Sequence, residues 1–207
     1  MDYRVKWTYD SRRFVKILDR KTKYCLNIGL SQSAHNFDEY SFVYTARGIY
    51  SCVTARNVSE YENNIRELMI NPFFQYAEVG AGLGEFIPNL VDNYKIKHLP
   101  IIIDPVDYEL MGNMLGYALN LKFSDRVNKN LLKLFERCKI IRDQNKVRLI
   151  NEDLVTAIKS HLDIHNIADI VIDNFGATHY MTNYRQCLDY ERKLLKPNGY
   201  LLLNNAN

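Results

Sequence analysis

Five short strand-forming runs mark the later part of the chain. They begin at Phe74, Leu99, Lys146, Ala168 and Tyr200, and each adjoins a polar or glycine-rich segment. Apolar runs of this length, bounded by turn residues, are typical of strands that are buried in a parallel sheet. Segments with helical periodicity lie between them, so the pattern predicts an α/β fold built from strand–helix–strand units.

The segment 106–142 is long for one crossover helix. One apolar helical face is formed by Leu110, Met111, Met114, Leu115 and Ala118. A second face is formed by Val127, Leu131, Leu134, Phe135 and Cys138. A polar break near Phe123–Asp125 separates them, so the pattern predicts two helices. Before the first strand, Ser59–Glu62 has capping-box spacing and predicts a helix that ends at Asn71–Pro72.

The amino-terminal part of the chain lacks this organisation. Within Phe14–Ile28, two β-prone runs flank a polar tetrad, which predicts a hairpin. Residues 29–57 contain many tyrosines and show no clear period. We therefore divide the chain into an α/β amino-terminal extension, 1–57, whose expected roles are a hairpin and a pocket cover, and a ligand-binding domain, 58–207.

The run Phe74–Phe86 leads from a strand through a glycine turn into a helix. Every second residue from 80 to 84 is glycine, which tolerates positive φ and leaves the main chain bare for a ligand. A dinucleotide fingerprint would require glycine at position 85, where Glu85 stands. With Glu78 on the other side of the turn, a cationic small ligand fits the pattern better than a pyrophosphate.

Asp104 ends the second strand and follows Gly84 at the spacing of about 20 residues that places a ribose-binding carboxylate in doubly wound folds. Such a carboxylate accepts hydrogen bonds from two ribose hydroxyls. The alternative role is a helix N-cap before Pro105. Asp153 has a similar alternative, as the cap of a helix that begins near Leu154.

These features together resemble the class I S-adenosylmethionine-dependent methyltransferases. The resemblance covers about residues 72–205 and rests on five ordered features, which are Glu78-Val-Gly-Ala-Gly-Leu-Gly84, Asp104, Asp153, Asp173 and the Leu-Lys-Pro-Asn-Gly phrase before Tyr200. It implies a doubly wound Rossmann-like sheet with strand order 3-2-1-4-5. It also implies an enzyme that transfers a methyl group from S-adenosyl-L-methionine to an acceptor.

The resemblance also assigns roles to site residues. For the cofactor it implies Glu78, Val79, Gly80, Ala81, Gly82 and Gly84 at the methionine portion, Asp104 and Pro105 at the ribose and adenine, Asp153 and Leu154 at the adenine, and Asp173 and Asn174 near the methyl group. Asn151 and Glu152 are alternatives to Asp153. His179 and Tyr180 follow the fourth strand, where a catalytic base is placed if the acceptor must lose a proton. A surface or packing role is the alternative for His179.

Two departures from the family narrow the expectation. The fourth-strand phrase is Asp173-Asn-Phe-Gly instead of Asn-Pro-Pro-Tyr, which argues against amino-base and glutamine acceptors without naming the right one. A small-molecule acceptor is the leading expectation. The chain also stops at Asn207, where the family adds a final two-strand hairpin, so that hairpin is absent from this sequence. A truncated sequence, a natural minimal fold and another segment in its place are the alternatives. The apolar edge at Tyr200–Leu203 would then need the amino-terminal hairpin or a second subunit, as in a homodimer, to cover it.

Composition adds the alternatives. The 207 residues are 47% hydrophobic and 25% charged, with a net charge of +3, which are ordinary values for a globular protein. Lysine and arginine are in excess in residues 1–25, so an RNA-directed methyltransferase is one alternative function, and a non-catalytic cofactor-binding module is another. The four cysteines show no metal-binding spacing, and no run is long enough to span a membrane. A cytoplasmic protein without a metal is therefore expected.

Overall fold

The computed structural model describes residues 3–8, 14–21, 25–29, 67–82, 90–91, 95–121, 123, 125–174 and 176–204. The chain divides into two compact units. The first unit comprises 1–46, 82–84 and 107–142, and the second comprises 47–81, 85–106 and 143–207. The boundary that the sequence predicts between residues 57 and 58 lies outside the described residues.

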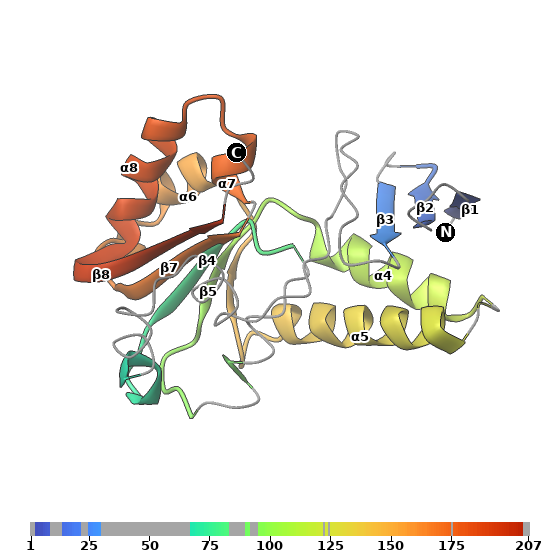
Figure 1. The fold of residues 1–207 in the computed structure, drawn as a ribbon, viewed down its shortest axis with the longest axis horizontal. Coiled ribbons are helices and arrows are strands. Elements are labelled where there is room, and N and C mark those ends of the chain that lie inside the picture. The colour runs from blue at the N-terminus through green and yellow to red at the C-terminus, as the bar shows by residue number, and fades with distance from the viewer. Residues whose placement is uncertain are drawn as a thin grey trace. The chain divides into compact units, whose positions relative to one another are not determined.

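A five-stranded parallel sheet forms the centre of the second unit (Figure 1). Its strands are β4 (Tyr76–Val79), β5 (Ile101–Ile103), β6 (Arg148–Ile150), β7 (Ala168–Asn174) and β8 (Leu195–Asn204). They lie in the order β6-β5-β4-β7-β8, which is 3-2-1-4-5 when the strands are numbered along the chain. The predicted strand order is confirmed, and the fold is Rossmann-like.

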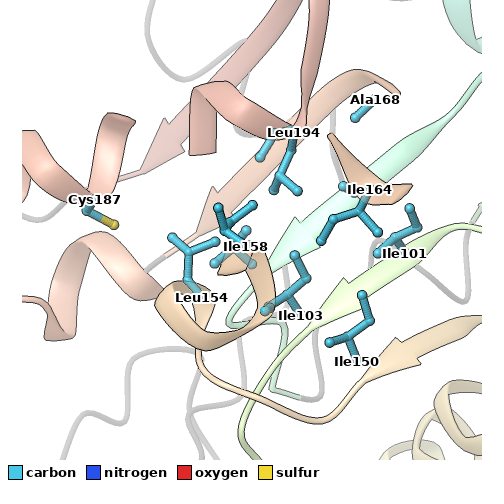
Figure 2. Packing of buried hydrophobic residues seen from close by; sticks show 13 residues of the cluster. Ile101, Ile103, Ile150, Leu154, Ile158, Ile164, Ala168, Cys187 and Leu194 are labelled. Atoms are coloured by element: carbon cyan, nitrogen blue, oxygen red, sulfur yellow. The ribbon is translucent and has the colours of Figure 1, made fainter. Parts of the chain in front are cut away.

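The apolar character of these strands is explained by their burial. All residues of β4 and β5 are buried, as expected for strands covered on both faces. On one face, the helices α6 (Leu154–Ser160) and α8 (Tyr184–Leu194) pack over the sheet (Figure 1). Figure 2 shows the core beneath them, which contains Ile101, Ile103, Ile150, Leu154, Ile158, Ile164 and Leu194. The second unit also contains the short helices η1 (Leu162–Ile164) and α7 (Ala177–Tyr180).

The predicted Pro-Asn-Gly turn before the last strand is instead a bulge inside β8. The register shifts between Ala168 and Ile170, whose partners are Leu195 and Tyr200. Asn198 adopts the left-handed backbone conformation, with φ of 67°, and this lets the extra residues leave the ladder. The strand therefore begins directly after α8, earlier than the sequence predicts.

The described part of the first unit contains an antiparallel sheet and two helices. The strands β1 (Tyr3–Thr8), β2 (Phe14–Asp19) and β3 (Cys25–Gly29) pair in sequential order, which confirms the predicted hairpin and adds β1. The hairpin does not extend the parallel sheet, so β8 is an edge strand among the described strands. The two helices predicted in 106–142 are also confirmed, as α4 (Tyr108–Leu119) and α5 (Asp125–Arg142).

Two other predicted helices fall mostly outside the described residues. Residues 67–70 and 90–91 are helical, and the remainder of the helices expected over 59–70 and 86–94 is not described. The first of these helices ends at Ile70, directly before Asn71, as predicted. None of the helices in the described ranges is long and apolar enough to cross a membrane.

Candidate functional site

The candidate site lies where β4, β5 and β7 end. Val79 of β4 is in register with Ile103 of β5 and Asp173 of β7, so the residues after these positions meet at one edge of the sheet. In the sheet, β5 pairs with β4 on one side and β7 pairs with β4 on the other side, so the strand order reverses at β4. Doubly wound folds bind ligands at this kind of switch point, outside the carboxyl ends of the strands.

Two glycines bring the turns after β4 and β7 into backbone contact. Gly80 has φ of +64°, and a Cβ atom built on it would overlap Cα of Gly176. A Cβ atom on Gly176 would overlap the carbonyl oxygen of Val79 and would lie 2.9 Å from Oδ1 of Asp173. Both positions therefore require glycine. Gly176 was not among the predicted site residues, although its place just after the fourth strand was a usable signal.

The remainder of the predicted glycine turn is described only in part. Gly82 also has a left-handed backbone, with φ of 51°, and its carbonyl oxygen accepts a hydrogen bond of 2.7 Å from the Tyr108 hydroxyl. Ala81 is buried. Gly84 lies outside the described residues, so its predicted role stays a prediction.

Glu78 is a buried carboxyl group whose protonation is perturbed. Its side chain is 2% exposed, and Oε2 accepts a hydrogen bond of 2.6 Å from the Tyr76 hydroxyl. Burial raises the pKa of Glu78 to about 8, and the charges of Asp104 and Asp173 act in the same direction against the Tyr76 bond. Glu78 is therefore largely protonated at neutral pH. A nearby cation would favour its ionised form.

Asp104 organises the loop after β5 and is not a helix cap. It is 2% exposed, and its Oδ1 accepts a hydrogen bond of 2.9 Å from the backbone N–H of Val106. The N-cap of α4 is Asp107, which accepts from the Leu110 backbone at 2.8 Å, so the capping alternative for Asp104 is wrong. The ribose-binding role of Asp104 stays a prediction.

The loop around Asp104 has a second support. The Asn151 amide donates to the carbonyl oxygens of Asp104 and Val106, at 2.9 and 2.5 Å. These bonds tie the end of β6 to the end of β5. Asn151 therefore has a structural partner, and Pro105 lies exposed in the same loop.

Asp153 is the N-cap of α6, as the alternative reading held. Its Oδ1 accepts from the Thr156 backbone at 3.0 Å, and its Oδ2 accepts from the Thr156 hydroxyl at 2.6 Å. The hydroxyl bond is the largest cause that lowers the pKa of Asp153. Leu154 packs in the core, and Glu152 lies 3.4 Å from His161. Whether Asp153 also meets adenine stays a prediction.

Replacement of Asp153 by alanine should lower the free energy of unfolding by about 1 kcal/mol, because α6 loses its cap. Urea denaturation measures this. Asp153→Ser is the matched control, since serine also caps helices, and it should recover most of the loss. A serine variant with full stability and weakened affinity for S-adenosylhomocysteine would assign Asp153 to the ligand as well.

Asp173 binds the turn that follows its own strand. It is fully buried, Oδ1 accepts from the Gly176 backbone at 2.6 Å, and Oδ2 accepts from the Thr178 backbone at 2.7 Å. Both oxygens therefore fix the start of α7. The side chains of Asn174 and His179 are not among those described, so their predicted roles stay predictions.

Tyr180 is the last residue of α7 and is 59% exposed. Partial burial raises the pKa of its hydroxyl, and the charge of Asp104 raises it further. The hydroxyl is therefore within electrostatic reach of the Asp104 carboxylate and stays protonated at neutral pH. Such a group suits hydrogen-bond donation better than proton abstraction.

Behind Asp173 lie two buried residues of α8 that the sequence did not single out. One potential ligand atom of each of Asp173, Cys187 and Glu191 lies within 4.8 Å of the others. Burial raises the pKa of Glu191 to about 9, and its hydrogen bond to Asp173 and the charge of Asp173 add to the shift. Burial likewise raises the pKa of the Cys187 thiol, so the thiol stays protonated.

Comparison with known proteins gives structural neighbours only. No protein-family model matches the chain, and no curated protein matches it in sequence. One similar solved structure is a proposed S-adenosyl-L-methionine-dependent methyltransferase from Methanococcus maripaludis, with TM-score 0.38 and 15% identity, covering 83% of this chain and 67% of the other. Another is a proposed transferase from Pyrococcus horikoshii, with TM-score 0.38 and 14% identity, covering 93% of this chain. This chain spans 53% of that second protein's length.

Proposed function

We propose that this chain binds S-adenosyl-L-methionine and transfers its methyl group to a small-molecule acceptor. The observation that carries the proposal is the gathering of Glu78, Asp104 and Asp173 around the Gly80 turn at the switch point of the sheet. The charges of Asp104 and Asp173 help to raise the pKa of Glu78, and carboxyl groups gathered in this way favour a cationic ligand. They disfavour the pyrophosphate of a dinucleotide, which other folds of this type bind at the same place.

The residues present fit this cofactor. Gly80 has left-handed backbone and packs on Gly176, so the turn that would meet the ligand is held against the end of β7. Glu78 is buried beside the turn and would ionise next to the ligand's ammonium group. Asp104 stands at the tip of β5, the position at which doubly wound folds bind ribose.

The cofactor supplies a methyl group made electrophilic by its sulfonium sulfur. The task of the chain is then to hold the acceptor close and aligned, which can contribute much of the rate. Asp173 fixes the segment 176–180 through two backbone hydrogen bonds, and we propose this segment as a wall of the acceptor site. Tyr180 would orient the acceptor as a hydrogen-bond donor, while His179 is our candidate for a base.

Titration calorimetry tests the proposal. We expect S-adenosylhomocysteine and S-adenosylmethionine to bind and NAD not to bind. Because the pKa of Glu78 is raised to about 8 and an ammonium group favours the carboxylate, binding at pH 7 should release a proton. The apparent binding enthalpy should therefore change with the ionisation enthalpy of the buffer.

Glu78→Gln is the matched control, since it keeps the shape and cannot ionise. Its binding enthalpy should show no such buffer dependence, and its affinity should fall. Tighter binding of NAD than of S-adenosylhomocysteine would overturn the proposal. Formation of S-adenosylhomocysteine with candidate acceptors then separates an enzyme from a cofactor-binding module.

A further inference from the structure

Glu191 lies inside the protein against Asp173, although it belongs to a helix with many charged residues. Its side chain has no exposed surface, and neither has Asp173. One oxygen of each carboxyl group and Sγ of Cys187 lie within 4.8 Å of one another, and Sγ of Cys187 lies 3.9 Å from Oε1 of Glu191. Two carboxyl groups in contact without water cannot both carry a charge at low cost.

The hydrogen bonds decide which carboxyl group holds the proton. Asp173 accepts two backbone N–H groups, which favours its ionised form. For Oε2 of Glu191, no donor is present among the residues that the structure describes. A buried oxygen without a donor, next to a carboxylate, is satisfied when it carries a proton and donates it.

A metal ion explains the same cluster less well. Both oxygens of Asp173 are already engaged with the backbone of Gly176 and Thr178. Burial raises the pKa of the Cys187 thiol, so the proton that a metal ion would have to displace is held more tightly than in an ordinary cysteine. The donor set therefore suits a shared proton.

We propose that Glu191 is a positioning residue whose protonated carboxyl group donates a hydrogen bond to Asp173 and thereby holds the turn at 176–178 in place. The positioning role of Glu191 rests on the proposed function in one respect. The turn at 176–178 belongs to the segment 176–180, which we propose as a wall of the acceptor site. When Glu191 loses its proton, two buried carboxylates face each other, and the turn that Asp173 binds is released.

Among the residues that the structure describes, few groups near Glu191 would compensate a second charge. From β7 it faces Asp173, and on its own helix it faces the Cys187 thiol. In β8, Lys196 is paired with Asp169, and in α6, Lys159 is exposed. From α7, Thr178 contributes a backbone N–H that Asp173 already accepts, and the side chain of His179 is not described.

Carboxyl carbon NMR over pH 4–11 tests the proposal without any ligand. We expect one buried glutamate to titrate near pH 9, and this signal to be absent from Glu191→Gln, whose amide still donates to Asp173. Glu78→Gln controls for the other raised group, expected near pH 8. A Glu191 signal that titrates near the ordinary glutamate value would overturn the proposal.

Stability against pH gives the second readout. Because the folded state holds the Glu191 proton above the pH at which the unfolded state loses it, stability should fall as pH rises toward 9. The unfolding equilibrium constant then rises by up to about tenfold per pH unit for this proton. Glu191→Gln should lack this part of the loss, and Asp173→Asn should show less of it than wild type, because it removes the charge beside Glu191 but leaves Glu191 buried.

The outcomes separate the two proposals. Identical pH dependence in wild type and Glu191→Gln overturns the positioning role, even if S-adenosylhomocysteine binds. If Glu191 titrates near pH 9 but S-adenosylhomocysteine does not bind, the hydrogen bond between Glu191 and Asp173 is supported and the proposed function is overturned. Stoichiometric Zn²⁺ binding that is lost in Glu191→Gln would also overturn the shared proton and assign a metal site.

Discussion

Gly176→Ala should lower the free energy of unfolding by about 1–3 kcal/mol, the range of a buried overpacked site. The new methyl group would overlap the Val79 carbonyl oxygen and approach Oδ1 of Asp173, and both of these atoms are held in place. Relief requires that the turns after β4 and β7 separate, which should also remove ligand binding. Urea denaturation and calorimetry with S-adenosylhomocysteine measure the two effects.

Gly116→Ala is the matched control for this substitution. Gly116 lies within α4, and a Cβ atom there would make an ordinary contact of 3.4 Å with the Phe135 ring. Alanine in a helix interior is favoured over glycine by about 0.5–1 kcal/mol, so this variant should be slightly more stable than wild type. If Gly176→Ala proved as stable as Gly116→Ala, the contact between the two turns would not be structurally required.

Asp104→Ala should weaken S-adenosylhomocysteine binding by on the order of 2–3 kcal/mol, or about 30–150-fold, because charge-assisted hydrogen bonds to the ribose are lost. Titration calorimetry gives the affinity. The alanine variant also loses the acceptor of the Val106 N–H group, so Asp104→Asn is the sharper change. It keeps an acceptor oxygen for Val106 and removes the charge.

Asp107→Asn is the control for a general electrostatic effect. Asp107 is an exposed cap only three positions along the chain, and asparagine caps helices well. Its affinity should match wild type. Equal affinities in Asp104→Asn, Asp104→Ala and wild type would mean that Asp104 serves the loop alone and that the ribose assignment is wrong.

The sequence was sufficient to predict the parallel sheet and its strand order. Apolar runs such as Leu99–Asp104 are typical of strands in a sheet covered by helices, and the strand order was implied by the resemblance to the class I methyltransferases. The turn at Gly80 and the polar residues Glu78, Asp104 and Asp173 were also predicted to share one edge, because they end or follow the strands.

The missed features depend on contacts between distant segments. Glu191 stands in the charged run Asp189-Tyr-Glu-Arg-Lys193, which is typical of a solvated helix face, and only packing of α8 on β7 shows that it is buried. Gly176 lacks the positive φ of a glycine turn, and the close approach of the Val79 carbonyl oxygen leaves no space for a side chain there. The strand β1 was detectable, since Tyr3–Thr8 alternates large apolar or aromatic with polar residues.

The contact between Gly80 and Gly176 has a mechanical consequence. Where side chains separate two loops, a rotamer change can absorb a small displacement. Here the backbone of Gly80 contacts the backbone of Gly176 directly, so no side chain can adjust between them. Close-packed interiors are nearly incompressible and transmit strain. A ligand that shifts the turn after β4 should therefore displace the turn after β7 by a similar amount. We expect a displacement of the turn after β4 on cofactor binding to move the turn after β7 as well, so that bound cofactor changes the affinity for the acceptor.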